Sequence, residues 1–134
     1  MEPYLLNIKN IGSKEEGFLS VTSNLSLPFI IRRVFWTVNT PLNVIRGRHA
    51  HYNTSMILIA ANGTIRISTI SEENNQQEFI LNEASRGLFI PKLCWHEMEY
   101  NKDAVQLVLT DTEYEEADYI RDKNKFFEII SKQE

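Results

Sequence analysis

The sequence predicts an all-β protein, an antiparallel sandwich or small barrel that ends in one short helix. Short stretches rich in β-branched and aromatic residues recur along most of the chain, separated by turn residues about every 8–12 positions, which is typical of antiparallel β folds. Near the end this pattern gives way to apolar residues at helical spacing. The chain has 134 residues and no stretch with the composition of a linker, so we expect one domain over residues 1–134.

The expected elements follow one another along the chain. In order, the strands are Tyr4–Ile8, Phe18–Thr22, Phe29–Asn39, Ser55–Ala61, Thr64–Ile70, Glu78–Leu81, Gly87–Ile90, Trp95–Tyr100 and Val105–Thr110. Asn62-Gly63 lies between two of these strands and predicts a tight β-hairpin. The polar run "SEENNQQ" predicts a solvated turn. A C-terminal helix is predicted from the apolar residues Tyr119, Ile120, Phe126, Phe127 and Ile130 of the final segment.

Composition excludes several classes of protein. Hydrophobic residues make up 43% and charged residues 24% of the chain, which is ordinary for a globular protein with a buried core. A net charge of −4 provides no cationic field for DNA or RNA, so nucleic acid is not expected as a partner. The single cysteine, Cys94, excludes an intramolecular disulfide. The longest apolar run is too short to cross a membrane and the N-terminus does not resemble a signal peptide, so we expect a cytoplasmic protein.

The three histidines of the chain fall into two motifs. His49 and His51 are two residues apart, so on a strand both imidazoles point to the same face. With Met56 and Gly63 they match the spacing of the first cupin signature, except that the signature has a carboxylate where this chain has Met56. Pro91-x-x-x-x-His96 resembles the second signature, with its glycine replaced. The pair of motifs predicts a cupin-type antiparallel jelly-roll barrel with a short C-terminal helix.

Three interpretations of the histidines remain open on spacing alone. Three imidazoles can bind zinc, iron or nickel, but a thioether is a poor replacement for the missing carboxylate, which disfavours a metal site. Alternatively, the histidines merely connect polar groups inside the barrel. The favoured interpretation is metal-free acid–base chemistry, because an imidazole that titrates near neutral pH can take a proton from one carbon and return it to another.

Longer segments resemble one particular family. The runs "IRRVFWTVNT…RGRHAHYN", "RGLFIPKLCWHEM" and "VLTDTEYEEADYIRD" are similar to the sugar 3,4-ketoisomerases, small cupin proteins that act on dTDP-4-keto-6-deoxyglucose. The resemblance implies an isomerase that moves the ketone of a dTDP-linked ketosugar from C4 to C3 through an enediol, without metal or other cofactor. Such an enzyme would supply deoxysugars for surface polysaccharides such as the O-antigen of lipopolysaccharide.

The same resemblance implies roles for individual residues. His49 and His51 correspond to the acid–base pair. Arg46 would hold the diphosphate or the sugar, although a surface ion pair explains it equally well. Further substrate-binding residues implied by the resemblance are Arg33, Trp36, Tyr52, Trp95 and His96. Trp95 offers a stacking surface for a base, but an aromatic residue in a small barrel is more often part of the core.

The chain departs from the family pattern at several polar positions. Phe35 and Trp36 replace two tyrosines, so a phenol that would contact the sugar is missing. Tyr52 and Met56 replace a lysine and a glutamine, and Glu16 replaces an N-terminal arginine. These departures favour either altered selectivity or a protein that binds a sugar nucleotide without turnover. A homodimer is expected, because an open jelly roll has edge strands that pairing would cover.

Overall fold

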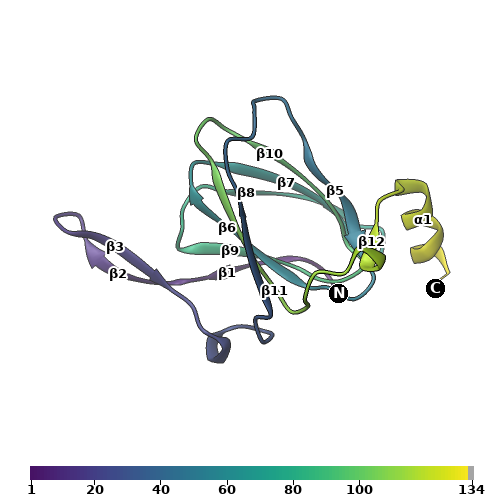
Figure 1. The fold of residues 1–134 in the computed structure, drawn as a ribbon, viewed down its shortest axis with the longest axis horizontal. Helices are drawn as coiled ribbons and strands as arrows, with labels where there is room; N and C mark the ends of the chain where they lie inside the picture. Colours follow the sequence, from purple (N-terminus) through teal and green to yellow (C-terminus); the bar gives the residue numbers. More distant parts are fainter. Residues whose placement is uncertain (133–134) are drawn as a thin grey trace.

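The computed structural model describes residues 1–132, which form two five-stranded antiparallel sheets packed face to face (Figure 1). In spatial order the first sheet contains β1 (Tyr4–Asn7), β9 (Arg86–Ile90), β6 (Met56–Asn62), β11 (Val105–Thr110) and β4 (Arg33–Thr37). The second contains β12 (Tyr119–Ile120), β5 (Arg46–His51), β10 (Trp95–Tyr100), β7 (Ile65–Ile70) and β8 (Gln76–Leu81). The predicted cupin-type jelly roll is confirmed, while the last two residues of the predicted domain lie outside the described part of the chain.

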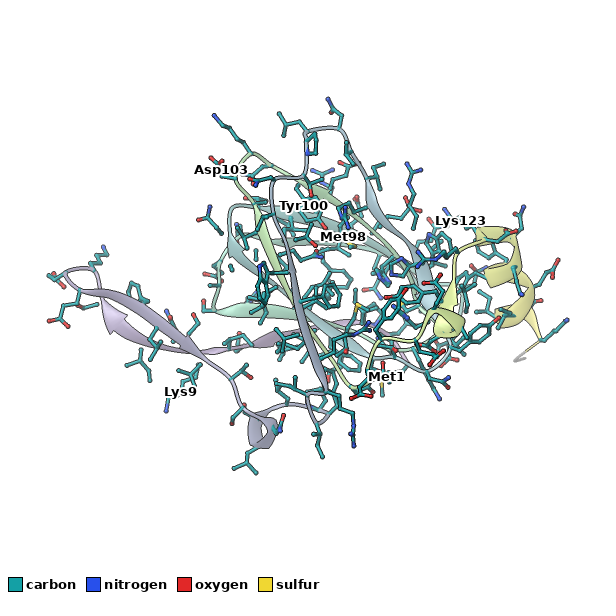
Figure 2. The ribbon with its side chains drawn as sticks, viewed as in Figure 1. Met1, Lys9, Met98, Tyr100, Asp103 and Lys123 are labelled. Carbon is teal, nitrogen blue, oxygen red and sulfur yellow. The ribbon has the colours of Figure 1, made fainter. Side chains whose placement is uncertain are left out.

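Two smaller elements lie outside the barrel. β2 (Lys9–Ser13) and β3 (Gly17–Val21) pair only with each other in the described structure and form a hairpin that projects from the body (Figure 1). The helix α1 (Lys123–Ser131) packs at the opposite end, beside β12 and β5. Lys9 and Lys123 mark these two ends in Figure 2. No helix among residues 1–132 is long and apolar enough to span a membrane.

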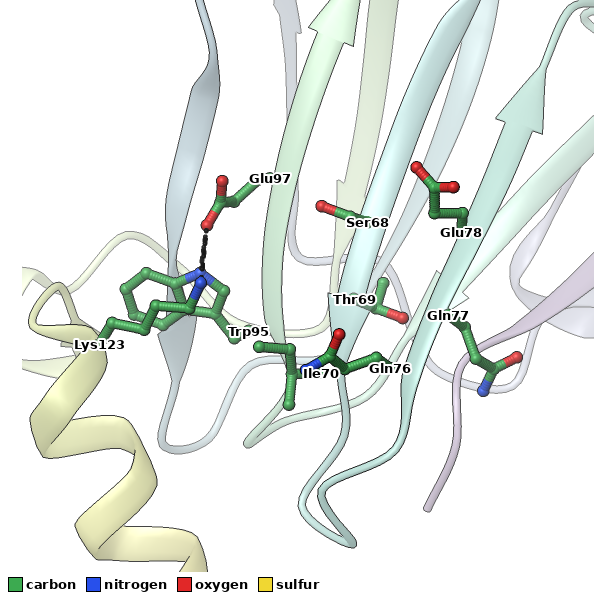
Figure 3. Close-up of a pocket in the computed structure, with 9 residues that line it drawn as sticks. All are labelled: Ser68, Thr69, Ile70, Gln76, Gln77, Glu78, Trp95, Glu97 and Lys123. Carbon is green, nitrogen blue, oxygen red and sulfur yellow. Dashed lines mark hydrogen bonds and ion pairs between the residues drawn. The ribbon is translucent and has the colours of Figure 1, made fainter.

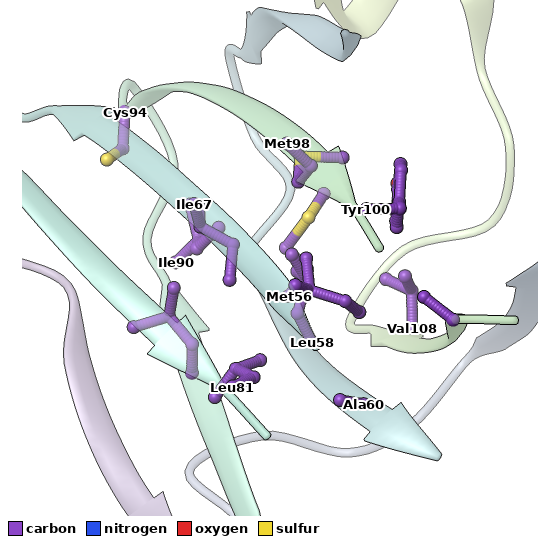
Figure 4. Packing of buried hydrophobic residues seen from close by; sticks show 13 residues of the cluster. Met56, Leu58, Ala60, Ile67, Leu81, Ile90, Cys94, Met98, Tyr100 and Val108 are labelled. Carbon is purple, nitrogen blue, oxygen red and sulfur yellow. The ribbon is translucent and has the colours of Figure 1, made fainter. Parts of the chain in front are cut away.

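The core lies between the two sheets and follows the alternation of side chains along each strand. Leu58 of β6, Ile67 of β7 and Leu88 of β9 are completely buried there. Met56 and Met98 lie in the same cluster, close to the cavity described below (Figure 4). Because one face of each strand fills this interior, residues two apart on a strand share an environment and neighbours do not.

The hairpin predicted at Asn62-Gly63 is wrong. β6 pairs with β9 and β11 in the first sheet, whereas β7 pairs with β8 and β10 in the second. Gly63 has the positive φ of 74° that the turn requires. The hydrogen bonds of the turn, however, go to another part of the chain. The Asn62 side chain donates to the carbonyl of Asp103, and the Thr64 amide donates to the side chain of Asn101, both at 2.8 Å. These contacts fix the turn to the β10–β11 connection, so the chain passes from one sheet to the other.

The C-terminal helix is confirmed, but it begins later than the apolar pattern suggested. The Asp122 carboxylate accepts hydrogen bonds from the first-turn amides of α1 and defines its start. Phe126 and Ile130 are buried and face the outer side of the second sheet. Tyr119 and Ile120, which were predicted to be helical, instead form β12 because they pair with the free edge of β5.

Candidate active site

A cavity of about 220 Å³ opens inside the barrel and contains all three histidines of the chain. Its polar lining is formed by Thr37, Arg46, His49, His51, His96, Gln106, Tyr119 and Arg121. Its apolar lining includes Phe35, Met56, Leu58, Met98 and Val108. Concave sites with an apolar wall and a few convergent polar groups are the usual form of small-molecule sites in proteins.

A β-bulge in β5 brings Arg46 to the same face as the histidines. His96 pairs with His49, but the next residue of β10, Glu97, pairs with Gly47, so one extra residue is accommodated in β5. Gly47 and Arg48 both have positive φ, at 82° and 59°. In a regular strand Arg46 and His49 would face opposite sides, because they are three residues apart. The bulge removes this restriction, and both side chains line the cavity.

Gly47 is required at the bulge for space as well as for backbone conformation. A Cβ atom there would lie 2.8 Å from the carbonyl oxygen of His96 and 3.0 Å from the sulfur of Met98. Any larger residue would therefore push β5 away from β10, and with it the histidines that the two strands hold together.

The three imidazoles form one compact cluster. The ring centroid of His49 lies 5.0 Å from that of His51 and 4.7 Å from that of His96. His49 and His51 share a face, as their spacing predicts, and β10 carries His96 to the same side. His51 and His96 are buried, and His49 is half-buried.

Hydrogen bonds determine which ring nitrogen of His49 and of His96 faces the cavity. The Nδ1 atom of His49 lies 3.0 Å from the carbonyl oxygen of Gly47, and Nδ1 of His96 lies 3.1 Å from that of Cys94. A carbonyl only accepts hydrogen bonds, so each Nδ1 carries the proton and each Nε2 keeps a lone pair. His51 differs, because its Nε2 is buried without a hydrogen-bond partner among the described residues. A buried, unpaired nitrogen in a cavity is ready to bind a ligand.

The cavity keeps the histidines uncharged at neutral pH. Burial, followed by the proximity of His96 and His51, lowers the pKa of His49 to about 2. Burial likewise lowers the pKa of His51 to about 3 and that of His96 to about 4. Each imidazole is therefore a neutral proton acceptor at pH 7, and an acidic C–H bond placed in the cavity would meet bases rather than cations.

Asp118 connects His51 to the end of β5. One of its carboxylate oxygens, Oδ2, lies 3.2 Å from Nδ1 of His51 and also accepts a short hydrogen bond from the hydroxyl of Thr54. The other oxygen accepts a hydrogen bond from the Asn53 amide at 2.7 Å. The carboxylate is thus held from two sides, and it places a negative charge beside Nδ1 of His51, on the ring whose other nitrogen has no partner among the described residues.

The histidine cluster also has the composition of a metal site. One nitrogen from each of His49, His51 and His96 lies within 4.8 Å of the others. Three neutral imidazoles suit zinc or iron, but the position of the expected carboxylate is occupied by Met56, which lines the cavity with a thioether. The donor set is therefore three nitrogens and no oxygen anion.

Only part of the predicted site is assembled in this cavity. His49, His51, Arg46 and His96 line it. Arg33 lies beside the cavity, where its Nε donates to the hydroxyl of Thr110 at 3.2 Å.

Three further predicted substrate-binding residues point away from the cavity. Trp36 is on the opposite face of β4 from Phe35 and is 65% exposed. Tyr52 packs beside α1 rather than toward the histidines. Trp95 alternates with His96 on β10 and therefore lies on the outer face of the sheet. Side-chain alternation explains all three positions.

Four further residues of the site were not predicted from the sequence. Asp118, Tyr119 and Arg121 belong to the "DYIR" segment near the C-terminus, and Gln106 is on β11. This segment resembles the family pattern, but the spacing of its apolar residues predicts a helix rather than the strand β12. Tyr119 and Arg121 are two residues apart and face the cavity together, which an extended conformation would have predicted.

A second, larger groove of about 560 Å³ lies on the outer face of β10, β7 and β8 (Figure 3). Three of its side chains contact one another. The Trp95 indole donates to a carboxylate oxygen of Glu97 at 2.8 Å, and the Lys123 ammonium lies 3.6 Å from the same oxygen. Trp95 also packs against Phe126 of α1, so its indole is already occupied by structural contacts.

Comparison with known proteins identifies the family. The family described as FdtA, WxcM-like, C-terminal matches residues 1–131. The chain belongs to the FdtA family. One curated relative is the TDP-4-oxo-6-deoxy-α-D-glucose-3,4-oxoisomerase of Aneurinibacillus thermoaerophilus. It is 33% identical to this chain over 133 residues, and the alignment covers 98% of this chain and 95% of the relative. The family resemblance predicted from the sequence is confirmed.

Solved structures agree with this assignment. QdtA, a sugar 3,4-ketoisomerase of Thermoanaerobacterium thermosaccharolyticum in complex with TDP, superposes with a TM-score of 0.91 at 31% identity, covering 98% of this FdtA-family chain and 96% of QdtA. WlaRA, a TDP-fucose-3,4-ketoisomerase of Campylobacter jejuni, gives a TM-score of 0.86 at 37% identity, with 96% of both chains covered.

Proposed function

We propose that this protein is an isomerase that moves the keto group between C4 and C3 of a TDP-linked 4-keto-6-deoxyhexose. One observation carries the proposal: inside a fold shared with 3,4-ketoisomerases, His51 presents a neutral, unpaired Nε2 in a cavity that also contains His49. No net oxidation occurs, because C4 is reduced as C3 is oxidised. The chemistry can therefore proceed by proton transfer alone, without a metal or a redox cofactor.

The proton on C3 is the one that a neutral imidazole can remove. It is acidic because it lies next to the C4 ketone, and its removal gives an enediol in which C3 and C4 share a double bond. Return of a proton to C4 then leaves the ketone at C3. We assign these carbon transfers to His49 and His51, whose rings lie on one face, 5.0 Å apart.

Charged and polar groups around the histidines suit a sugar diphosphate. Arg46 and Arg121 line the cavity, so a negatively charged ligand finds two guanidinium groups despite the net negative charge of the chain. Oε1 of Gln106 is buried without a partner among the described residues and can accept a hydrogen bond from a sugar hydroxyl. Arg121 is paired with Glu116, and a diphosphate would compete for it.

The second candidate is a protein that binds the sugar nucleotide without turnover or with altered selectivity. Phe35 and Met56 line the cavity where the resembled ketoisomerases have a tyrosine and a glutamine, so two polar contacts to a sugar are replaced by apolar ones. This candidate predicts TDP-sugar binding with an unchanged sugar. Tight binding in calorimetry, with no change in the NMR spectrum of the sugar over hours, would support it.

Deuterium exchange distinguishes the two candidates. The protein is incubated with TDP-4-keto-6-deoxyglucose in D₂O, and both the ketone position and the label on the sugar ring are followed by NMR. We expect ketone migration with solvent label for the wild type, and a loss of about 10²- to 10⁴-fold for His51→Asn. Equal, slow labelling by wild type and variant would refute the isomerase.

We also propose a homodimer formed through the projecting hairpin. By strand register, Ile11 pairs with Leu19, and Val21 is on the same face of the ribbon. These side chains are 48%, 60% and 39% exposed, so an isolated chain leaves an apolar strip in water. A second copy would cover it. Light scattering should give a dimer for the wild type and a monomer for Leu19→Glu, whereas Ser20→Glu, on the opposite face, should remain dimeric.

The proposed setting is the cytoplasm, in the synthesis of deoxysugars for surface polysaccharides such as the O-antigen of lipopolysaccharide. A sugar diphosphate is charged and does not cross a lipid bilayer unaided. Its ketone must therefore be moved in the compartment where the sugar nucleotide is made.

A further inference from the structure

Ketone migration moves two protons, and the histidine pair accounts for only one of them. As the C3–H bond breaks, its electron pair forms the C3=C4 bond, and the C4=O π pair moves to O4, which takes a proton. In the second half O3–H loses its proton, the C3=O bond forms, and the C3=C4 pair takes a proton at C4. The sum is one proton moved from carbon to carbon and one moved from oxygen to oxygen.

The oxygen proton requires a group that can both donate and accept within one turnover. Arg46 and Arg121 stay protonated and cannot accept. Gln106 offers an amide, which does not act as an acid or a base at neutral pH. An aliphatic hydroxyl such as that of Thr37 is a much weaker acid than a phenol. The third histidine, His96, keeps a lone pair on Nε2 and has no proton to give to O4 in the first half. Among the groups that line the cavity, the remaining oxygen acid is the phenol of Tyr119.

The sheet places Tyr119 directly beside the histidine pair. In the β12–β5 ladder it pairs with His51, and directly paired residues of antiparallel strands share a face. Its ring centroid lies 4.4 Å from that of His51 and 5.0 Å from that of His49. Within residues 1–132 no hydrogen bond engages its hydroxyl, whereas the hydroxyl of the nearby Tyr114 is bonded to Glu116.

Other contacts hold the Tyr119 ring in position. The Arg121 guanidinium lies 4.3 Å from its ring centroid, a cation–π distance. Arg121 is itself held by Glu116 through two hydrogen bonds of 2.9 and 3.1 Å. The phenol is therefore positioned by its neighbours while its hydroxyl stays available to a ligand.

We propose that Tyr119 is a catalytic residue that relays the proton between O3 and O4 of the sugar while the histidines move the carbon proton. This assignment rests on the proposed isomerase function. It gives the chain a phenol in the cavity although Phe35 stands where the resembled family has a tyrosine.

The test compares wild type, Tyr119→Phe and Tyr4→Phe in D₂O with TDP-4-keto-6-deoxyglucose. Two quantities are measured by NMR: conversion to the 3-keto product, and deuterium at C3 of the recovered substrate. Without the relay, proton removal at C3 is followed more often by return to C3. We therefore expect conversion by Tyr119→Phe to fall about 10²-fold or more, with the ratio of C3 label to product raised about tenfold.

Controls separate this role from a structural one. Tyr4 of β1 is 43% exposed and does not line the cavity, so Tyr4→Phe should behave as wild type. Calorimetry should give Tyr119→Phe an affinity for TDP within about twofold of wild type. If conversion and C3 labelling fall equally in Tyr119→Phe, or if conversion is unchanged, Tyr119 is not the relay although the isomerase stands. If the wild type converts no substrate, both proposals are wrong.

Discussion

The two faces of β10 carry opposite kinds of polar site. On the outward face, Trp95 and Glu97 line a groove of about 560 Å³. The carboxylate of Glu97 accepts a hydrogen bond from the Trp95 indole and forms an ion pair with Lys123. Inward, His96 borders a cavity of about 220 Å³ in which the Nε2 of His51 has no partner among the described residues. In the larger hollow the indole, carboxylate and ammonium groups are paired and one hydroxyl, that of Thr69, lacks a partner among residues 1–132. In the smaller one the unpartnered atoms, on His51 and Gln106, lie beside other groups that can act as acids and bases.

The contrast indicates which hollow has a function. A buried polar atom without a hydrogen-bond partner lowers the free energy of unfolding by about 1–3 kcal/mol, so such an atom is not there for stability. A ligand that completes its hydrogen bonds recovers that cost. The inner cavity has such atoms on His51 and on Gln106. Residues of the outer groove, by contrast, hold α1 against the sheet.

Asp118→Asn should have the largest effect among the predictions that sharpen this contrast. The substitution keeps the size of the side chain but removes the negative charge 3.2 Å from Nδ1 of His51. An amide can present its NH₂ group to the imidazole and favour the wrong tautomer, so we expect isomerisation to fall about 10²-fold. The measurement is the rate of ketone migration, followed by NMR.

Asp111→Asn is the matched control for this substitution. The Asp111 carboxylate also accepts a hydrogen bond from a backbone amide, that of Ser55 at 2.9 Å, but it contacts no histidine. A loss of activity in Asp111→Asn as large as that in Asp118→Asn would mean that the effect comes from the loop rather than from His51.

The local part of this site could be predicted from sequence, whereas the long-range part could not. The i, i+2 spacing of His49 and His51 fixed their common face once β5 was a strand. The face of Arg46 depended on a bulge opposite His96, fifty positions further along the chain, and only the pairing of β5 with β10 reveals it. The strand that contains Tyr119 forms only because it pairs with the free edge of β5, and the sequence does not show that pairing.

The Asn62-Gly63 turn illustrates the same limit. Its backbone conformation was predictable, because Gly63 adopts the positive φ that such turns use. The partners of the flanking strands were not, since hydrogen bonds to Asn101 and Asp103 draw the turn toward the β10–β11 connection. A turn motif predicts a change of direction, whereas strand pairing depends on contacts far away in sequence.

The next prediction concerns the free energy of unfolding between pH 6.5 and 4. All histidines of the chain belong to the inner site, so histidine titration in this range reports on that site alone. All three line the cavity, with folded pKa values of about 2, 3 and 4 against an ordinary value of 6.5. Below pH 6.5 the unfolded chain takes up protons that the folded chain does not, so stability falls with pH until the folded pKa is reached. Each histidine adds a slope of about 1.4 kcal/mol per pH unit.

His96→Gln isolates one of these contributions. The free energy of unfolding is measured by denaturant titration at several pH values from 7 to 5. Below pH 6.5 the unfolding free energy of the variant should fall less steeply than that of the wild type, by about 1.4 kcal/mol per pH unit. This difference is a tenfold change in the folding equilibrium per unit. Parallel pH profiles for the two proteins would show that His96 is protonated in the folded state.

The smallest effect is expected for Glu97→Gln in the outer groove. The Trp95 indole can still donate to the amide oxygen, and only the charge facing Lys123 is lost. That pair is 3.6 Å apart, and the Lys123 side chain is 49% exposed, so its loss should cost about 0.5 kcal/mol or less. Isomerisation, measured as for Asp118→Asn, should stay within about twofold of wild type. A hundredfold loss would instead place the outer groove in the functional site and overturn the contrast, because the charge of Glu97 is the smallest of the influences on the pKa of His96 and cannot by itself explain so large an effect.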